Sequence, residues 1–201
     1  MADLATNARL IEAVRQLMTA AATSEVPPDE LQQITASIGD LTGRLAKETR
    51  PTPFRSHLDL AAIDRVRAGE AWPLWTHNPL AIPLDIKVSD GVATSDLLVA
   101  PLYEGPPGLM HGGMSAAVLD SLLAVLAQVQ RRRVVTVRLE MSYLAPIPLG
   151  STVHLVGEIT ASQGRKTTAV GEIRLPAGDD GQVIVAVRAE ALLLEIPGAP
   201  D

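Results

Sequence analysis

The stretch His111-Gly112-Gly113-Met114-Ser115-Ala116-Ala117-Val118-Leu119-Asp120-Ser121-Leu122-Leu123 decides the fold of this chain. Two glycines open an apolar segment that reads as a helix, and Asp120 interrupts its apolar face. A buried carboxylate without a partner is costly, so Asp120 either forms a local hydrogen bond or works as a base in a dry pocket. Adjacent glycines at a helix start let a ligand approach the backbone and offer free N–H donors. Together these are the parts of an oxyanion site and a general base.

The segments around this helix read as two N-terminal helices and a set of strands. Apolar residues recur at helical spacing over 3–22 and again from Pro27 to about Lys47. Residues 50–83 hold both tryptophans and several prolines, and they predict an irregular linking segment with a possible short helix at 60–67. The central helix should cover about 112–130. Six strands are predicted, at 84–88, 92–99, 134–144, 152–161, 167–175 and 183–194. Strands arranged around one long helix favour an α+β fold with an antiparallel sheet.

Composition narrows the class of protein. The 201 residues suffice for a domain of ordinary size, and the net charge of −6 argues against a nucleic-acid surface. The absence of cysteine excludes disulfides and a thiol nucleophile, and it suits a reducing compartment. The N-terminus lacks a signal-peptide pattern, and no stretch of eighteen uncharged apolar residues occurs. We therefore expect a cytoplasmic protein without a membrane span.

The motif and its flanks resemble a known family. His-Gly-Gly followed by Asp at the ninth position after the His is similar to the motif of the hotdog-fold acyl-CoA thioesterases, closest to the phenylacetic-acid-pathway-like and mammalian thioesterase-superfamily branches. The lead-in 103–110, the strand 135–146 and the turn Gly164-Arg165-Lys166 also resemble that family. The resemblance covers roughly 80–195. It implies a strongly curved antiparallel sheet wrapping the central helix, so we expect a hotdog domain at 81–201 and an N-terminal helical extension at 1–80.

The resemblance also implies an activity, the hydrolysis of acyl-CoA to free acid and coenzyme A. The backbone N–H of Gly112 or Gly113 would hold the thioester oxygen, and Asp120 would activate water or attack directly. Thr136 matches a hydroxyl that helps to hold the water, and His111 would order the loop. One branch has an asparagine six residues before the His, where this chain has Gly105, so the resemblance implies no side-chain contribution to the oxyanion site at this position.

Helix geometry predicts a dimer. Nine residues place His111 and Asp120 about half a turn and roughly 13 Å apart on a straight helix, too far to act on one carbonyl. Two copies of the helix, antiparallel across a two-fold axis, would bring the glycine end of one to the Asp of the other. A homodimer or a dimer of dimers, and hence a tetramer, is therefore expected.

Coenzyme A carries phosphates, so an acidic protein needs local cations to bind it. Arg165 and Lys166, after Gly164, stand where the family often grips the nucleotide end, although a solvated turn explains them equally well. His57, His77 and His154 lack the spacing of metal ligands, so we expect no metal and no cofactor beyond the coenzyme A of the substrate.

Two other functions fit the same scaffold. A non-catalytic module could bind acyl-CoA or lipid, although such a module has no need of Asp120. A hotdog hydratase would require an Asp and a His close together near Asn78-Pro79, and both are missing from their places.

Overall fold

The computed structural model describes residues 3–54, 58–130, 133–177 and 181–196. Contacts between Cα atoms divide the chain into two compact units, one of residues 1–55 with 77–80 and one of residues 56–76 with 81–201. The domain boundary that the sequence predicts between residues 80 and 81 stays a prediction.

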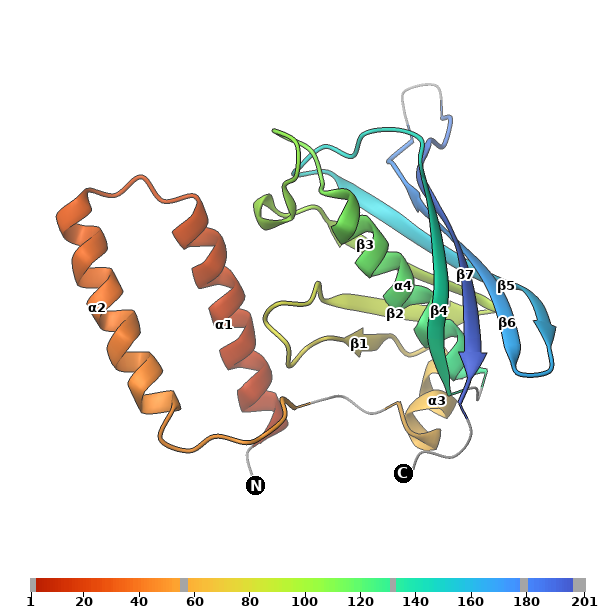
Figure 1. Ribbon diagram of the computed structural model, residues 1–201, viewed down its shortest axis with the longest axis horizontal. Helices are drawn as coiled ribbons and strands as arrows, with labels where there is room; N and C mark the ends of the chain where they lie inside the picture. The colour runs from red at the N-terminus through yellow and green to blue at the C-terminus, as the bar shows by residue number, and fades with distance from the viewer. Residues whose placement is uncertain (1–2, 55–57, 131–132, 178–180, 197–201) are drawn as a thin grey trace. The chain divides into compact units, whose positions relative to one another are not determined.

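The first unit holds the two predicted N-terminal helices, α1 (Leu4–Ala22) and α2 (Pro28–Leu45) (Figure 1). Asp3 caps α1, since its carboxylate accepts hydrogen bonds from the amides of Ala5 and Thr6. A proline begins α2, at a position where the missing N–H costs nothing. Neither helix contains a buried residue.

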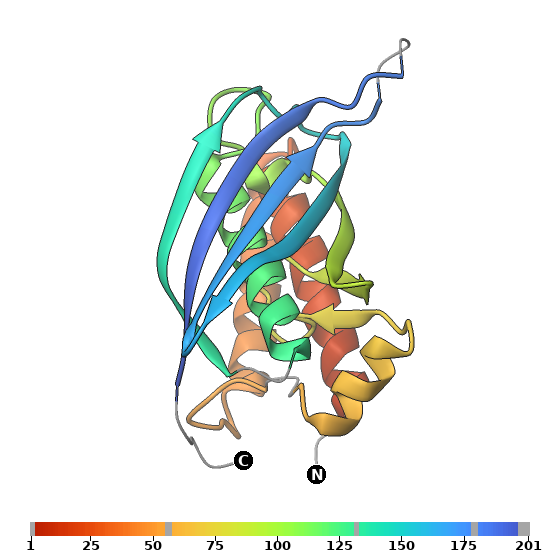
Figure 2. The same cartoon turned by 90° about the vertical axis from the view of Figure 1, so that its right-hand side faces the viewer.

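The second unit contains a seven-stranded sheet in which every neighbouring pair is antiparallel. The strands are β1 (Trp72–Leu74), β2 (Leu84–Ser89), β3 (Val92–Leu98), β4 (Val134–Tyr143), β5 (Thr152–Gln163), β6 (Lys166–Arg174) and β7 (Val185–Glu195). Their spatial order is β1-β2-β3-β5-β6-β7-β4, so β4 forms one edge of the sheet. Figure 2 shows the long strands curving across the central helix α4 (Gly112–Val129). The predicted hotdog fold is confirmed in its sheet, its central helix and its N-terminal helices.

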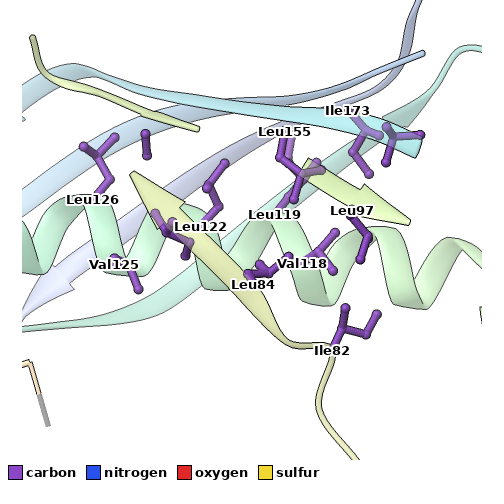
Figure 3. Close-up of a cluster of buried hydrophobic side chains, with 14 of the residues drawn as sticks. Ile82, Leu84, Leu97, Val118, Leu119, Leu122, Val125, Leu126, Leu155 and Ile173 are labelled. Carbon is purple, nitrogen blue, oxygen red and sulfur yellow. The ribbon is translucent and has the colours of Figure 1, made fainter. Parts of the chain in front are cut away.

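The core lies between α4 and the concave face of the sheet. Leu119 and Leu122 of α4 are fully buried against side chains such as Leu155 and Ile173 (Figure 3). Burial of β2 alternates strictly along the strand, because successive side chains point to opposite faces. Among the described residues, α4 is the one helix long and apolar enough to span a bilayer, a property that the core helix of a folded domain shares.

Two glycines let α4 approach the sheet closely. Gly157 of β5 and Gly171 of β6 lie opposite each other in the register. A Cβ atom at Gly157 would lie 2.8 Å from Leu123 Cδ2, and one at Gly171 would lie 3.2 Å from Leu119 Cδ2. A side chain at Gly157 would therefore force the end of the Leu123 side chain to shift.

The linking segment is more regular than predicted. The predicted short helix is present as α3 (Leu60–Arg67), which Asp59 caps by accepting a hydrogen bond from the Ala62 amide at 2.7 Å. The expectation of irregular structure was wrong at Trp72–Leu74, which pairs with β2 as strand β1. Its proline is tolerated because β1 is an edge strand, and the run is too short to show a period. A single 3₁₀ turn, η1 (Pro101–Tyr103), begins the loop that leads to α4.

Candidate active site

The first turn of α4 is closed by the side chain of His111. His111 is the N-cap, and its Nδ1 accepts a hydrogen bond of 2.9 Å from the Gly113 amide. The neutral imidazole therefore carries its proton on Nε2. This cap occupies one of the two glycine amides that the sequence offered as an oxyanion donor.

The Gly112 amide, unlike that of Gly113, donates no hydrogen bond to the His111 cap. No acceptor for it is found among the described residues, while its carbonyl accepts a hydrogen bond of 3.0 Å from the Tyr143 hydroxyl. A Cβ atom at Gly112 would lie 3.1 Å from two ring atoms of Tyr143, so the ring and the helix end pack closely. The Gly112 amide thus points from the positive end of a helix without a partner of its own.

Gly105 packs directly against the N-cap. A Cβ atom there would lie 2.8 Å from the Cα and 2.9 Å from the Cβ of His111. The backbone also turns tightly, since the Gly105 amide donates to the Leu109 carbonyl at 2.9 Å. The asparagine of the resembled branch would not fit at this position without moving His111.

A cavity of about 440 Å³ opens beside this helix end. Its walls come from the loop before α4, from the chain at 143–147 and from Val187 of β7, and they are largely apolar. Gly112 and Ser115 of α4 complete the lining. The volume and the apolar walls are typical of a site for a small organic group.

Asp120 and Thr136 meet at a second place on α4. The Thr136 hydroxyl donates a hydrogen bond of 2.6 Å to Oδ1 of Asp120, and the pair is partly buried. Thr136 lies on β4, where the pairing with β7 shifts by one residue between Thr136 and Arg138. The fold therefore joins two candidate residues that are 16 positions apart, and the contact orients the carboxylate.

Asp120 does not line the cavity. Eight residues separate it from Gly112 on one unbroken helix, a rise of about 12 Å. Within one copy of the chain, the open amide and the carboxylate are therefore too far apart to act on the same carbonyl carbon.

The turn with Arg165 and Lys166 lies at the same end of the sheet as Thr136. In the register, Leu193 of β7 faces Thr136 on one side and Thr167 on the other. Two strand spacings, about 10 Å, thus separate Thr136 from Thr167, which directly follows Lys166. Gly164 has a φ of +56° that suits a tight turn, and Nε of Arg165 donates to the Glu195 carbonyl at 2.9 Å. Arg165 is therefore anchored at the end of the sheet that carries Thr136, and neither Arg165 nor Lys166 lines the cavity.

Three residues of this region were not identified as site residues from the sequence. The Trp75 indole donates a hydrogen bond of 3.1 Å to the Ser121 hydroxyl, next to Asp120. Trp75 also has a φ of +63°, which strains a bulky residue by about 1–3 kcal/mol. Ser115 and Tyr143 line the cavity. Of the three, only Ser115 had a signal in the sequence, because it is a serine on an otherwise apolar helix face.

Within the described ranges, no three His, Cys, Asp or Glu side chains gather as a metal site would require.

Comparisons with known proteins agree with this architecture. Residues 107–184 match the family model described as thioesterase superfamily. Acyl-coenzyme A thioesterase THEM4 of Xenopus laevis is 34% identical over 96 residues, which are 48% of this chain and 41% of the relative. THEM4 of Bos taurus is 33% identical over 66 residues, 33% of this chain and 27% of the relative. The chain therefore matches less than half the length of these curated relatives.

Solved structures share the fold. A thioesterase superfamily protein matches with a TM-score of 0.75 and 28% identity over 94% of both chains, so the likeness includes the N-terminal region. An acyl-CoA hydrolase from Staphylococcus aureus, solved with butyryl coenzyme A and coenzyme A, matches 55% of this chain and 70% of its own, with a TM-score of 0.51. At 20% identity this second likeness concerns the fold alone.

Proposed function

We propose that the chain belongs to the thioesterase superfamily, whose model matches residues 107–184, and that it hydrolyses acyl-CoA thioesters to a free acid and coenzyme A. The observation that carries the proposal is the contact between Thr136 and Asp120, a carboxylate on an apolar helix held by a hydroxyl at 2.6 Å. A helix that only packed against the sheet would have no use for a carboxylate there.

The Gly112 amide accounts for one half of the chemistry. It would hold the thioester oxygen as negative charge develops on it, with the helix dipole adding to the attraction. Because the His111 cap engages the Gly113 amide, we assign the oxyanion role to Gly112 and the ordering of the loop to His111.

Asp120 accounts for the other half. As a base it would take a proton from water while the water oxygen attacks the thioester carbon, and the proton would pass to the departing thiolate of coenzyme A. As a nucleophile it would form an anhydride that water then opens, with the same products. In either route Thr136 fixes the carboxylate, and its hydroxyl would also help to hold the incoming water.

The two halves require two copies of the chain. One straight helix keeps Gly112 and Asp120 about 12 Å apart, whereas antiparallel copies would bring them together in two equivalent sites. The edge strand β4 supports this arrangement, because within the described part of the chain it pairs with β7 alone, and it exposes Val135 and Val137. A long apolar edge strand can form backbone hydrogen bonds with a strand of another chain.

In such a dimer each copy has a distinct task. The cavity beside Gly112 of one copy would take the acyl group. The second copy would supply Asp120 and Thr136, and with them the nearby turn of Arg165 and Lys166 for the phosphates of coenzyme A. One substrate would thus span both copies.

A turnover panel tests the proposal. Coenzyme A esters of acetyl, hexanoyl, palmitoyl and phenylacetyl groups are incubated with the purified chain, and the released thiol is measured. At least one ester should be hydrolysed far above its rate in buffer. If esters bind, as seen by calorimetry, but none releases thiol, the chain is instead a module that binds acyl-CoA without chemistry.

A further inference from the structure

The hydroxyl of Ser115 is a buried polar group inside an apolar cavity. Ser115 is 2% exposed and lies on the face of α4 that carries Leu119 and Leu122 against the sheet. It lines the cavity of about 440 Å³. None of the described residues exchanges a hydrogen bond with its hydroxyl, so that hydroxyl is open to whatever occupies the cavity.

Such a group calls for a partner. The Ser115 hydroxyl is not one of the fully enclosed unpaired polar atoms, so it reaches the open cavity, and a bound acyl group that covers it leaves it unmet unless that group supplies a partner. An alanine would fill the same space, suit a helix better and leave no polar atom unmet. A cavity built for plain hydrocarbon chains would therefore be better served without Ser115.

The position of Ser115 indicates where on an acyl group the partner would lie. Ser115 follows Gly112 by three residues, so the two share a face, with a rise of about 4.5 Å between them. The Cβ of a helical residue leans toward the N-terminus, and this brings the hydroxyl back toward Gly112. With the thioester oxygen on the Gly112 amide, about three carbon–carbon bonds lead from the carbonyl carbon to the region of Ser115.

We propose that Ser115 selects acyl groups that carry a hydroxyl or keto oxygen near the third or fourth carbon. This inference rests on the proposed thioesterase function. A serine hydroxyl both donates and accepts, so it matches either oxygen. The other walls are apolar and suit the hydrocarbon that continues beyond that point. A site that bonds a substrate oxygen discriminates against an analogue lacking it, because the polar group of the site is then left unpaired.

A matched pair of esters tests this selection. We compare kcat/KM for 3-hydroxyhexanoyl-CoA and hexanoyl-CoA in the wild-type chain and in Ser115→Ala. The wild type should prefer the hydroxylated ester by roughly tenfold, the usual scale of one hydrogen bond. Ser115→Ala should bring the ratio close to one, chiefly by improving turnover of the plain ester. Ser89→Ala, the same change at an exposed serine of β2 outside the cavity, should leave the ratio unchanged.

The outcomes separate this inference from the proposed function. Equal ratios in the wild type and Ser115→Ala, with both esters hydrolysed, would overturn the Ser115 assignment and leave the thioesterase proposal standing. If neither ester is hydrolysed, the panel of four esters decides the thioesterase proposal, and calorimetric binding of the two hexanoyl esters decides the assignment of Ser115. A binding preference lost in Ser115→Ala then supports it, and equal binding contradicts it. Thermal unfolding of both variants shows that each has kept its fold.

Discussion

At the scale of single residues, the central feature is a carboxylate held by one hydroxyl. Asp120 and Thr136 come from a helix and an edge strand, and their side chains meet at 2.6 Å. The hydroxyl orients the carboxylate and lowers the cost of keeping it partly buried.

Thr136→Val removes this hydrogen bond while keeping the shape of the side chain. We expect turnover of the best acyl-CoA to fall about tenfold and the free energy of unfolding to fall by about 1 kcal/mol, as for the loss of one hydrogen bond. Thiol release and urea unfolding measure the two effects. Thr136→Ser keeps the hydroxyl and should stay close to the wild type in both. A Thr136→Val protein with wild-type turnover would remove Thr136 from the site.

Some of these residues could be predicted from the sequence and others could not. The spacing of His111, Gly112 and Asp120 marks the segment, because a helix start and a mid-helix carboxylate are local patterns. The choice of Gly112 over Gly113 depends on the rotamer of the His111 cap, and the open hydroxyl of Ser115 depends on long-range packing. The left-handed backbone of Trp75 has no local sequence signal either, since tryptophan rarely adopts it.

At the scale of elements, periodicity predicted the helices and the long strands within a few residues of their ends. The central helix and strands β2 to β7 have clear periods and turn residues between them. Strand β1 was missed because three residues with a proline carry no period, and its pairing with β2 is a tertiary effect. The sequence also could not show which strand forms the edge, because strand order depends on pairings between distant segments.

Val137→Lys places a charge on the exposed edge strand. Val137 is 52% exposed, so the fold should tolerate the change, but a lysine there should prevent pairing with a second copy. We expect a monomer by light scattering and little remaining turnover. Val183→Lys is the control. Val183 precedes β7 in the sequence and is 55% exposed, so this change should leave the proposed dimer intact. An active monomer of either the variant or the wild type would refute the shared site.

Arg165→Ala with Lys166→Ala tests the turn as a phosphate grip. We expect KM for an acyl-CoA to rise while kcat stays nearly unchanged, since phosphate contacts act equally on the ground and transition states. A matched acyl-pantetheine ester lacks the nucleotide and should be unaffected. Added salt should imitate the double variant, because exposed charges are screened within about 8–10 Å. Lys87→Ala, an exposed lysine on β2, is the control. An equal loss on both esters would mean that the turn supports the fold.

At the scale of the whole molecule, the proposed reaction requires two copies of one chain. Each copy carries both an open Gly112 amide and an Asp120 carboxylate, but the length of α4 keeps the two apart. The cavity lies at one end of the helix and the cationic turn at the other end of the sheet, so a substrate that uses all of them must bridge the copies.

Thiol release by mixed dimers tests this claim most directly. Asp120→Asn removes the base, and Gly112→Pro removes the amide at the first helix position, where the backbone accepts proline and the Tyr143 ring must shift slightly to make room for its Cβ. Each variant alone should lose at least ~100-fold in turnover. Co-expressed in equal amounts, the two should regain about a quarter of wild-type turnover, because half of the dimers are mixed and each mixed dimer holds one intact site. The shared site would be contradicted if either variant alone stays active. It would also be contradicted if the co-expressed variants form mixed dimers but stay inactive.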